Sequence, residues 1–326
     1  RRERARVCGG GGSWRRGARG VVSEPLKATL FALQKRERGG VLLGAFVCFV
    51  LMSAVLLGGL LALMLPAFGF DFSNLGATAQ TPPNPTTALW IVPAALVWTF
   101  AYCVMTASFE AACLRWMIRG ERPGLFGMTL DEDTWRVYGI YWIWLLCYAV
   151  AWIGFFILNG LLSRLFSDNQ IVIWVGWAIY GLLILVAAAA LAPASAVSIA
   201  ERRLVFGDAA QATEDHFGSL LGSYALLFGV QWLLNSGWPV VWMLWALRGD
   251  VAQYFESASD PMSAYTAYNS AMAGAMNSPG AMQVYWIISA ATLVVSLVFM
   301  VLIYGVNARV ARLALAEGRI GAAASP

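Results

Sequence analysis

Six long apolar runs constrain this chain more than any other feature of its sequence. Each run holds about 20 or more mostly apolar residues, enough for a helix rising about 1.5 Å per residue to cross a hydrocarbon core about 30 Å thick. An open strand is excluded there, because lipid offers no hydrogen-bond partner to a peptide group. The sequence therefore predicts an all-α polytopic bundle of six transmembrane helices. The predicted spans cover residues 41–65, 88–113, 137–162, 171–195, 220–247 and 284–304.

Composition indicates that lipid is the solvent of these runs. Of the 326 residues, 60% are hydrophobic and 12% are charged, whereas a soluble domain carries about 25% charged residues. Four of the five cysteines lie within apolar runs, which predicts buried free thiols and no disulfide framework. The cysteines are Cys8, Cys48, Cys103, Cys113 and Cys147.

The placement of lysine and arginine predicts the orientation of the chain. With six spans, both termini lie on the same side of the membrane. Two of the 22 basic residues, Arg164 and Arg248, fall on the other side, and the remaining 20 share the side of the termini. Because cytoplasmic loops carry the excess of Lys and Arg, we expect a bacterial inner-membrane protein with both termini in the cytoplasm.

The first 21 residues differ from the rest of the chain. They are basic and rich in glycine, with seven arginines in the first 20 residues. We expect a disordered leader here, or upstream sequence that precedes a true start at Val22. A tail that binds anionic lipid or nucleic acid is the alternative, although no nucleic-acid partner is expected. The six-span membrane domain is then predicted for residues 22–316, and a disordered tail for residues 317–326.

Three short amphipathic segments precede the odd-numbered spans on the arginine-rich side. Each begins with a helix-capping pattern, which satisfies the first free N–H groups of a helix. Each then meets glycine, which permits a turn from the membrane plane into the span. This repeat predicts three interfacial amphipathic helices on the cytoplasmic side. The proposed caps and breaks are Ser23 with Gly39 and Gly40, Thr129 and Glu132 with Gly139, and Asp208 and Gln211 with Gly218 and Gly222.

A family resemblance rests on the segment that leads into the fifth span, ERRLVFGDAAQATEDHFGSLLG. It resembles six-span bacterial inner-membrane proteins related to the membrane domain of some glycerophosphodiester phosphodiesterases. Where this family tends to have a large residue such as tryptophan, the chain has Ala210. The resemblance implies a membrane location but not phosphodiester hydrolysis, because it covers only the membrane part. The matching positions are Phe206, Ala209, Thr213, Phe217 and Gly222.

Residue types exclude several kinds of chemistry. His216 is the single histidine, so one chain cannot build a histidine-rich metal site, and no G-x-S-x-G elbow occurs. No catalytic residue, metal or cofactor is predicted. The acidic run from Asp131 to Asp133 is interpreted as a solvated first helical turn, with cation binding as the alternative. In the last external loop, Met272 and Met276 stand at helical spacing and favour a short covering helix over a copper site.

Polar stripes follow several of the spans. In the second span, a line of polar residues ends at Glu110, a carboxylate inside an apolar run. We expect Glu110 to face the bundle and to pair with Arg202, with Arg203 or with a polar group of the fifth span. Pro193 is expected to kink the fourth span, because it removes a helical hydrogen bond. The second-span stripe contains Thr99, Tyr102, Cys103, Thr106, Glu110 and Cys113, and the fifth-span stripe contains Tyr224, Gln231 and Asn235.

Two functions compete on this sequence. The first is a scaffold or an envelope- and lipid-associated membrane protein, without a catalytic site. The alternative is a transporter of small solutes or lipids that uses the polar stripes; an intramembrane enzyme is third. Membrane lipids are the expected partners, together with a second copy or another membrane protein. The candidate polar site consists of Glu110, Thr106, Tyr102, Gln231, Asn235, Arg202 and Arg203.

Overall fold

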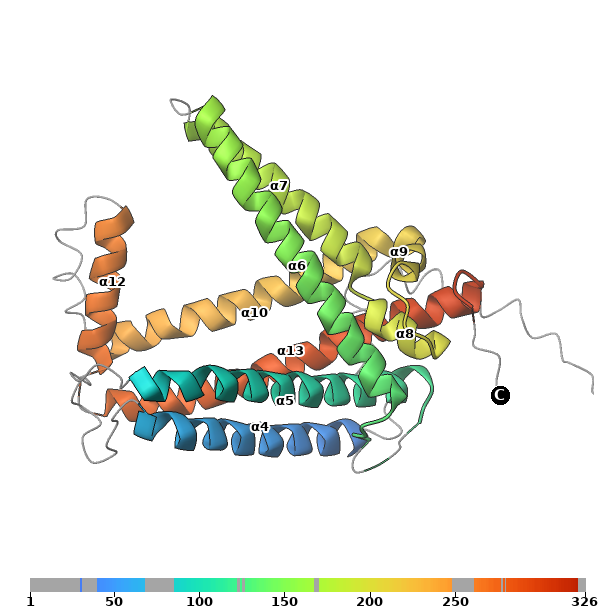
Figure 1. Ribbon diagram of the computed structural model, residues 1–326, viewed down its shortest axis with the longest axis horizontal. Coiled ribbons are helices and arrows are strands. Elements are labelled where there is room, and N and C mark those ends of the chain that lie inside the picture. Colours follow the sequence, from blue (N-terminus) through green and yellow to red (C-terminus); the bar gives the residue numbers. More distant parts are fainter. Residues whose placement is uncertain are drawn as a thin grey trace, which may run out of the picture. The chain divides into compact units, whose positions relative to one another are not determined.

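The six predicted spans appear as helices in a computed structural model. It describes residues 30, 40–67, 85–121, 124, 127–166, 170–247, 261–276, 278 and 280–321. The all-α bundle is confirmed: six helices are long and apolar enough to cross a membrane, so the chain is a multi-pass membrane protein. In Figure 1 the long helices are α4 (Gly40–Ala67), α5 (Pro85–Ile118), α6 (Glu132–Leu165), α7 (Gln170–Leu191), α10 (Phe217–Ala246) and α13 (Ala281–Glu317).

Shorter elements join the spans, and the chain divides into two compact units. The short elements are α8 (Ala194–Glu201), α9 (Asp208–Thr213), the 3-10 turn η3 (Glu214–His216) and α12 (Pro261–Met276). The first unit ends at Leu221 and resumes at Tyr304, so it holds α4 to α9, the start of α10 and the end of α13. The second unit, Gly222–Ile303, holds the rest of α10 and α13 together with α12.

The core of the first unit lies at one end of its helices. Buried residues cluster at the end of α5, the start of α6, α8, α9 and the end of α13. Farther along α6 and α7, large apolar side chains such as Phe156 and Leu183 are exposed, as expected of surfaces that contact lipid. Helix α5 also packs against α4 (Figure 1). The rings of Phe49 on α4 and Phe109 on α5 lie 4.8 Å apart.

Pro193 interrupts the fourth span, as predicted. Helix α7 ends at Leu191, and Pro193 is the N-cap of α8. At the other end of α8, Arg202 adopts the left-handed conformation with φ of 54° and closes the helix. This break lets the chain present α8 as a separate short helix, buried along its whole length.

The sixth span continues beyond its predicted end at residue 304. Helix α13 runs to Glu317, because its last turns carry small and apolar residues that are buried in the first unit, among them Val306, Ala308 and Ala311. Residues 317–321, which were expected to begin a disordered tail, have defined contacts, and Ile320 is buried. The apolar-run criterion missed these turns because Arg309 and Arg312 interrupt the run.

The interfacial segment before α6 is not a separate helix, so this prediction is wrong. Helix α6 runs without a break from Glu132 through Gly139, and its N-cap is Asp131, whose carboxylate accepts from the backbone N–H of Thr134 at 3.2 Å. The glycine serves close packing instead of a turn: a Cβ there would lie 2.6 Å from Cδ1 of Leu204.

The segment before α10 is a short helix, but its predicted details are wrong. Asp208 is the first helical residue of α9, after Gly207 as N-cap, and no side chain caps the helix. The break falls at η3, whereas Gly218 and Gly222 lie inside α10. A helix interior tolerates glycine at a cost of about 1 kcal/mol. The presence of glycine in the sequence therefore does not show where the helix breaks. The segment before α4, with Ser23 and Gly39, lies outside the described residues.

The second unit contains the predicted covering helix. Helix α12 packs against α10 and α13, and Met272 and Met276 contact the buried cluster around Trp242. The indole Nε1 of Trp242 donates to the carbonyl of Ala281 at 2.9 Å and joins α10 to α13. The methionines therefore fill space in an apolar cluster, which is the role their helical spacing predicted.

Candidate functional site

Glu110 lies at the meeting point of four helices in the first unit. It belongs to α5 and is 5% exposed. The hydroxyl of Tyr141 on α6 donates to Oε2 of Glu110 at 2.7 Å. The hydroxyls of Ser195 on α8 and Tyr304 on α13 also hydrogen-bond with this carboxyl. One buried carboxyl thus holds together the helix ends that form the core of the unit.

The predicted arginine partners of Glu110 are wrong. Arg202 donates to Glu121 at 3.1 Å, and Arg203 binds Glu201 at 2.6 Å and Asp208 at 2.9 Å. Both arginines follow the last turn of α8 and are exposed, so they stay in contact with water, as charged groups prefer. The hydrogen bond that Arg203 donates to Glu201 raises the pKa of the Arg203 guanidinium, which therefore stays charged.

The remainder of the second-span stripe does not converge on Glu110. Tyr102 is exposed and stacks on Trp98 with ring centroids 5.3 Å apart. Thr106 donates its hydroxyl to the backbone carbonyl of Tyr102 at 2.8 Å, within its own helix. Only the last part of the stripe is buried, including Cys113 one turn beyond Glu110.

The fifth-span candidates belong to the second unit. Gln231 is half-buried and Asn235 is exposed. Asn235 accepts a hydrogen bond from the hydroxyl of Ser296 on α13 at 3.3 Å. Such bonds join membrane helices at a gain of about 0.6 kcal/mol each, so this contact acts as packing between α10 and α13.

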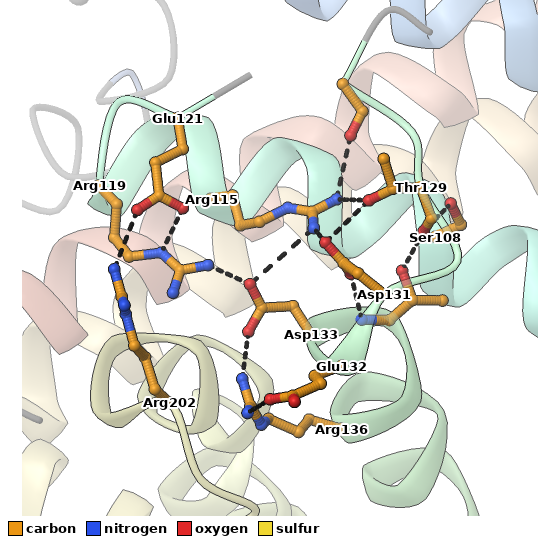
Figure 2. A network of polar contacts seen from close by, with 12 residues as sticks. Ser108, Arg115, Arg119, Glu121, Thr129, Asp131, Glu132, Asp133, Arg136 and Arg202 are labelled. Carbon is orange, nitrogen blue, oxygen red and sulfur yellow. Dashed lines mark hydrogen bonds and ion pairs between the residues drawn. The ribbon is translucent and has the colours of Figure 1, made fainter. Parts of the chain in front are cut away.

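A buried arginine organises the loop between α5 and α6. Arg115, on the last turns of α5, is 1% exposed and pairs with Asp131. It also donates to the hydroxyl of Thr129 at 2.9 Å and to the carbonyl of Gly127 at 3.0 Å. Figure 2 shows the loop placing these oxygens around one guanidinium. A planar group with five donors suits this arrangement better than a lysine would.

Asp133 is the second centre of the same network. Its side chain is 8% exposed and pairs with Arg119, one turn beyond Arg115, and with Arg136 at 2.6 Å (Figure 2). Through Glu121, which lies 3.2 Å from Arg119 and 3.1 Å from Arg202, the network reaches the end of α8. Alternating charges therefore join α5, α6 and α8 at this end.

The interpretation of the acidic run as a solvated helical turn is wrong for two of its three residues. The side chain of Glu132 is 85% exposed and pairs with Arg136 of its own helix, whereas Asp131 and Asp133 bind the arginines of α5. A sequence signal existed: Arg115 and Arg119 stand four residues apart on one face of a helix, and acidic residues follow after a short loop. Charge complementarity across that loop would have predicted the network.

The short segment after α13 contacts α9 and α8. Arg319 donates to the carbonyls of Gln211 and Ala212 at 3.1 and 3.0 Å. The backbone N–H of Gly321 donates to the buried carboxylate of Glu201 at 3.0 Å. The two Arg319 bonds satisfy backbone carbonyls near the end of α9, where a helix leaves carbonyls without helical partners.

The motif behind the family resemblance supports the packing of α9. Ala209 and Thr213 are buried, and the hydroxyl of Thr213 donates to the carbonyl of Ala190 on α7 at 3.2 Å. Phe206 packs edge-on against Trp144 of α6 with centroids 5.6 Å apart. Ala210, the position that departs from the family pattern, is exposed.

Replacing Asp208 with alanine should change stability little. Asp208 is not a cap but a first-turn residue whose partner, Arg203, is exposed. We expect a loss below about 1 kcal/mol, the usual size of a charge effect at a helix start. Hydrogen exchange across residues 209–217 should remain close to wild type. A marked acceleration there would restore the capping role that the sequence pattern indicated.

The chemistry of this site is hydrogen bonding and charge pairing. Within the described residues, no group of three or more His, Cys, Asp or Glu side chains is arranged to hold a metal ion.

No protein-family model, characterised protein or solved structure matches this chain.

Proposed function

We propose that this chain is a non-catalytic scaffold of the bacterial inner membrane, associated with the envelope and its lipids, with both termini in the cytoplasm. We also propose that the chain is related to the six-span proteins that its α9 motif resembles. Its expected contacts are lipids and a second copy or another membrane protein.

The proposal rests on the partners of the buried polar groups, which belong to the same unit of the chain. Glu110, Arg115 and Asp133 each bind side chains from neighbouring segments of the same unit. A transporter needs polar groups that face a path and exchange partners with a substrate. Here the same groups join α5, α6, α8 and α13, which favours a rigid structural role.

A transporter is the alternative, and the cluster of hydroxyls around Glu110 is the observation in its favour. Ionisable groups inside membrane spans often mark proton or ion pathways. In that case the polar stripes of the second and fifth spans would contact the solute; these stripes contain Tyr102 and Thr106 on α5 and Gln231 and Asn235 on α10.

Complementation with stripe variants separates the two functions. The chain would be disrupted in its host, and any envelope defect, such as sensitivity to detergents, would be rescued with variants. The scaffold predicts full rescue by Tyr102→Phe, Thr106→Val, Gln231→Leu and Asn235→Leu combined. Loss of rescue with normal amounts of folded protein in the membrane would favour transport. Wild-type rescue and membrane insertion of the variant are the controls.

Reporter fusions test the orientation. Because 20 of the 22 basic residues lie on one side, fusions after Gln80 and after Ala271 should report the periplasm. Fusions after Gly124 and after Gly207 should report the cytoplasm. A cytoplasmic signal at Ala271 would contradict the arrangement of six spans with both termini inside.

A further inference from the structure

We propose that Glu110 and the hydroxyls of Tyr141, Ser195 and Tyr304 form a binding site for a single proton inside the membrane-spanning part of the chain. This goes beyond the proposed function, since both a scaffold and a transporter can hold such a proton. The proton resides on the Glu110 carboxyl and is shared with the hydroxyls around it.

The charge of the groups around Glu110 favours a bound proton. Glu110 is buried, and in the described part of the chain the hydrogen bonds to its carboxyl come from neutral hydroxyls. Arg115, five residues on, is bound to the following loop. A carboxylate removed from water without a cation costs several kcal/mol, and such a group takes up a proton or another cation instead.

The donors and acceptors of the four groups also favour a protonated Glu110. An ionised carboxylate only accepts, whereas a protonated carboxyl also donates, and Ser and Tyr hydroxyls do both. With Glu110 protonated, each of the four groups can donate one bond and accept another. The cluster is then closed and neutral, which suits a site between helices in lipid.

The distance between Tyr141 and Glu110 distinguishes a bound proton from a bound metal ion. Tyr141 Oη lies 2.7 Å from Glu110 Oε2, the distance of a direct O–H···O bond. A metal ion between these two oxygens, at about 2.3–2.6 Å from each, would hold them farther apart. Three titratable groups face Glu110 in the described part of the chain: the phenols of Tyr141 and Tyr304, and the thiol of Cys113 one turn along α5.

Infrared spectroscopy of the intact chain tests the proposal. The protein is purified at neutral pH in a detergent without carbonyl groups, with glutamate labelled with ¹³C at its side-chain carboxyl. We expect a C=O band of a protonated carboxylic acid that shifts with the label and disappears in Glu110→Gln. Absence of the band, or a band that survives in Glu110→Gln, overturns the proposal. If Glu110 is instead an ionised carboxylate that accepts hydrogen bonds from the three hydroxyls, this C=O band is absent.

Two further measurements cover the cases in which Glu110→Gln does not fold or a metal ion occupies the site. If Glu110→Gln does not fold, Tyr141→Phe serves instead: loss of one hydrogen bond should shift the labelled band without removing it, and an unchanged frequency overturns the assignment. Thermal unfolding in sodium chloride and in choline chloride of equal ionic strength should give the same midpoint. A midpoint raised by sodium in the wild type but not in Glu110→Gln would assign the site to a metal ion.

Discussion

Replacing Arg115 with alanine should destabilise the chain by about 3 kcal/mol, the low end of the range for removing one partner of a buried ion pair. The guanidinium is buried and holds Asp131, Thr129 and the carbonyl of Gly127 in the loop before α6. Without it, these oxygens lose their donor and a cavity remains. The cost stays at the low end because Asp131 is partly exposed and water can replace the arginine there.

Equilibrium unfolding in mixed micelles of increasing SDS content measures this effect. Arg203→Ala is the matched control, because Arg203 also binds two acidic residues but lies on the surface. The control should unfold close to the wild type, since solvent screens exposed pairs. Equal behaviour of the two variants would show that the Arg115 network does not stabilise the fold.

Replacing Glu110 with alanine should also cost about 3 kcal/mol, whereas Glu110→Gln should stay within about 1 kcal/mol of the wild type. Alanine leaves the hydroxyls of Tyr141, Ser195 and Tyr304 buried with fewer partners, and each unsatisfied group costs about 1–3 kcal/mol. Glutamine has nearly the shape of a protonated glutamate, with an amide NH2 group as donor in place of the O–H and a carbonyl oxygen as acceptor. The same unfolding measurement compares the pair.

Thr106→Val is a control for position on α5. Among the described residues, its hydroxyl donates to the carbonyl of Tyr102 in its own helix, so the free energy of unfolding lost with this hydroxyl should be small. An alanine variant of Glu110 as stable as the wild type would refute the structural role of the carboxyl. A glutamine variant as unstable as the alanine variant would show that the cluster needs a charge.

The elements set by apolar length could be predicted from the sequence. The span predicted at residues 41–65 corresponds to α4, Gly40–Ala67, and that at residues 220–247 to α10, Phe217–Ala246. A membrane helix must satisfy its own backbone along its whole apolar length, so this pattern locates the span, although a helix such as α13 can continue beyond it to Glu317. The break at Pro193 was predictable for a similarly local reason: proline lacks a backbone N–H.

Contacts between distant segments could not be predicted in the same way. Ser195 contacts Glu110 only because the break after α7 presents α8 to α5, and Tyr304, the last residue of the predicted sixth span, meets Glu110 through the packing of α13 against α5. Helical periodicity shows which residues share a face but not which helix that face meets. Arg202 was therefore a reasonable partner for Glu110 by position, although the left-handed turn at this residue places it at the surface.

Reactivity of Cys113 tests most directly whether the polar core of the first unit is closed. Cys113 is fully buried, one helical turn from Glu110. In a chain whose other cysteines are replaced by alanine, a membrane-impermeant maleimide added to either side of native membranes should leave Cys113 unlabelled until SDS unfolds the protein. A cysteine at the exposed position of Leu130 should react at once in the same assay. Labelling of Cys113 in the folded protein would reveal a water-filled path to Glu110 and would contradict the closed core.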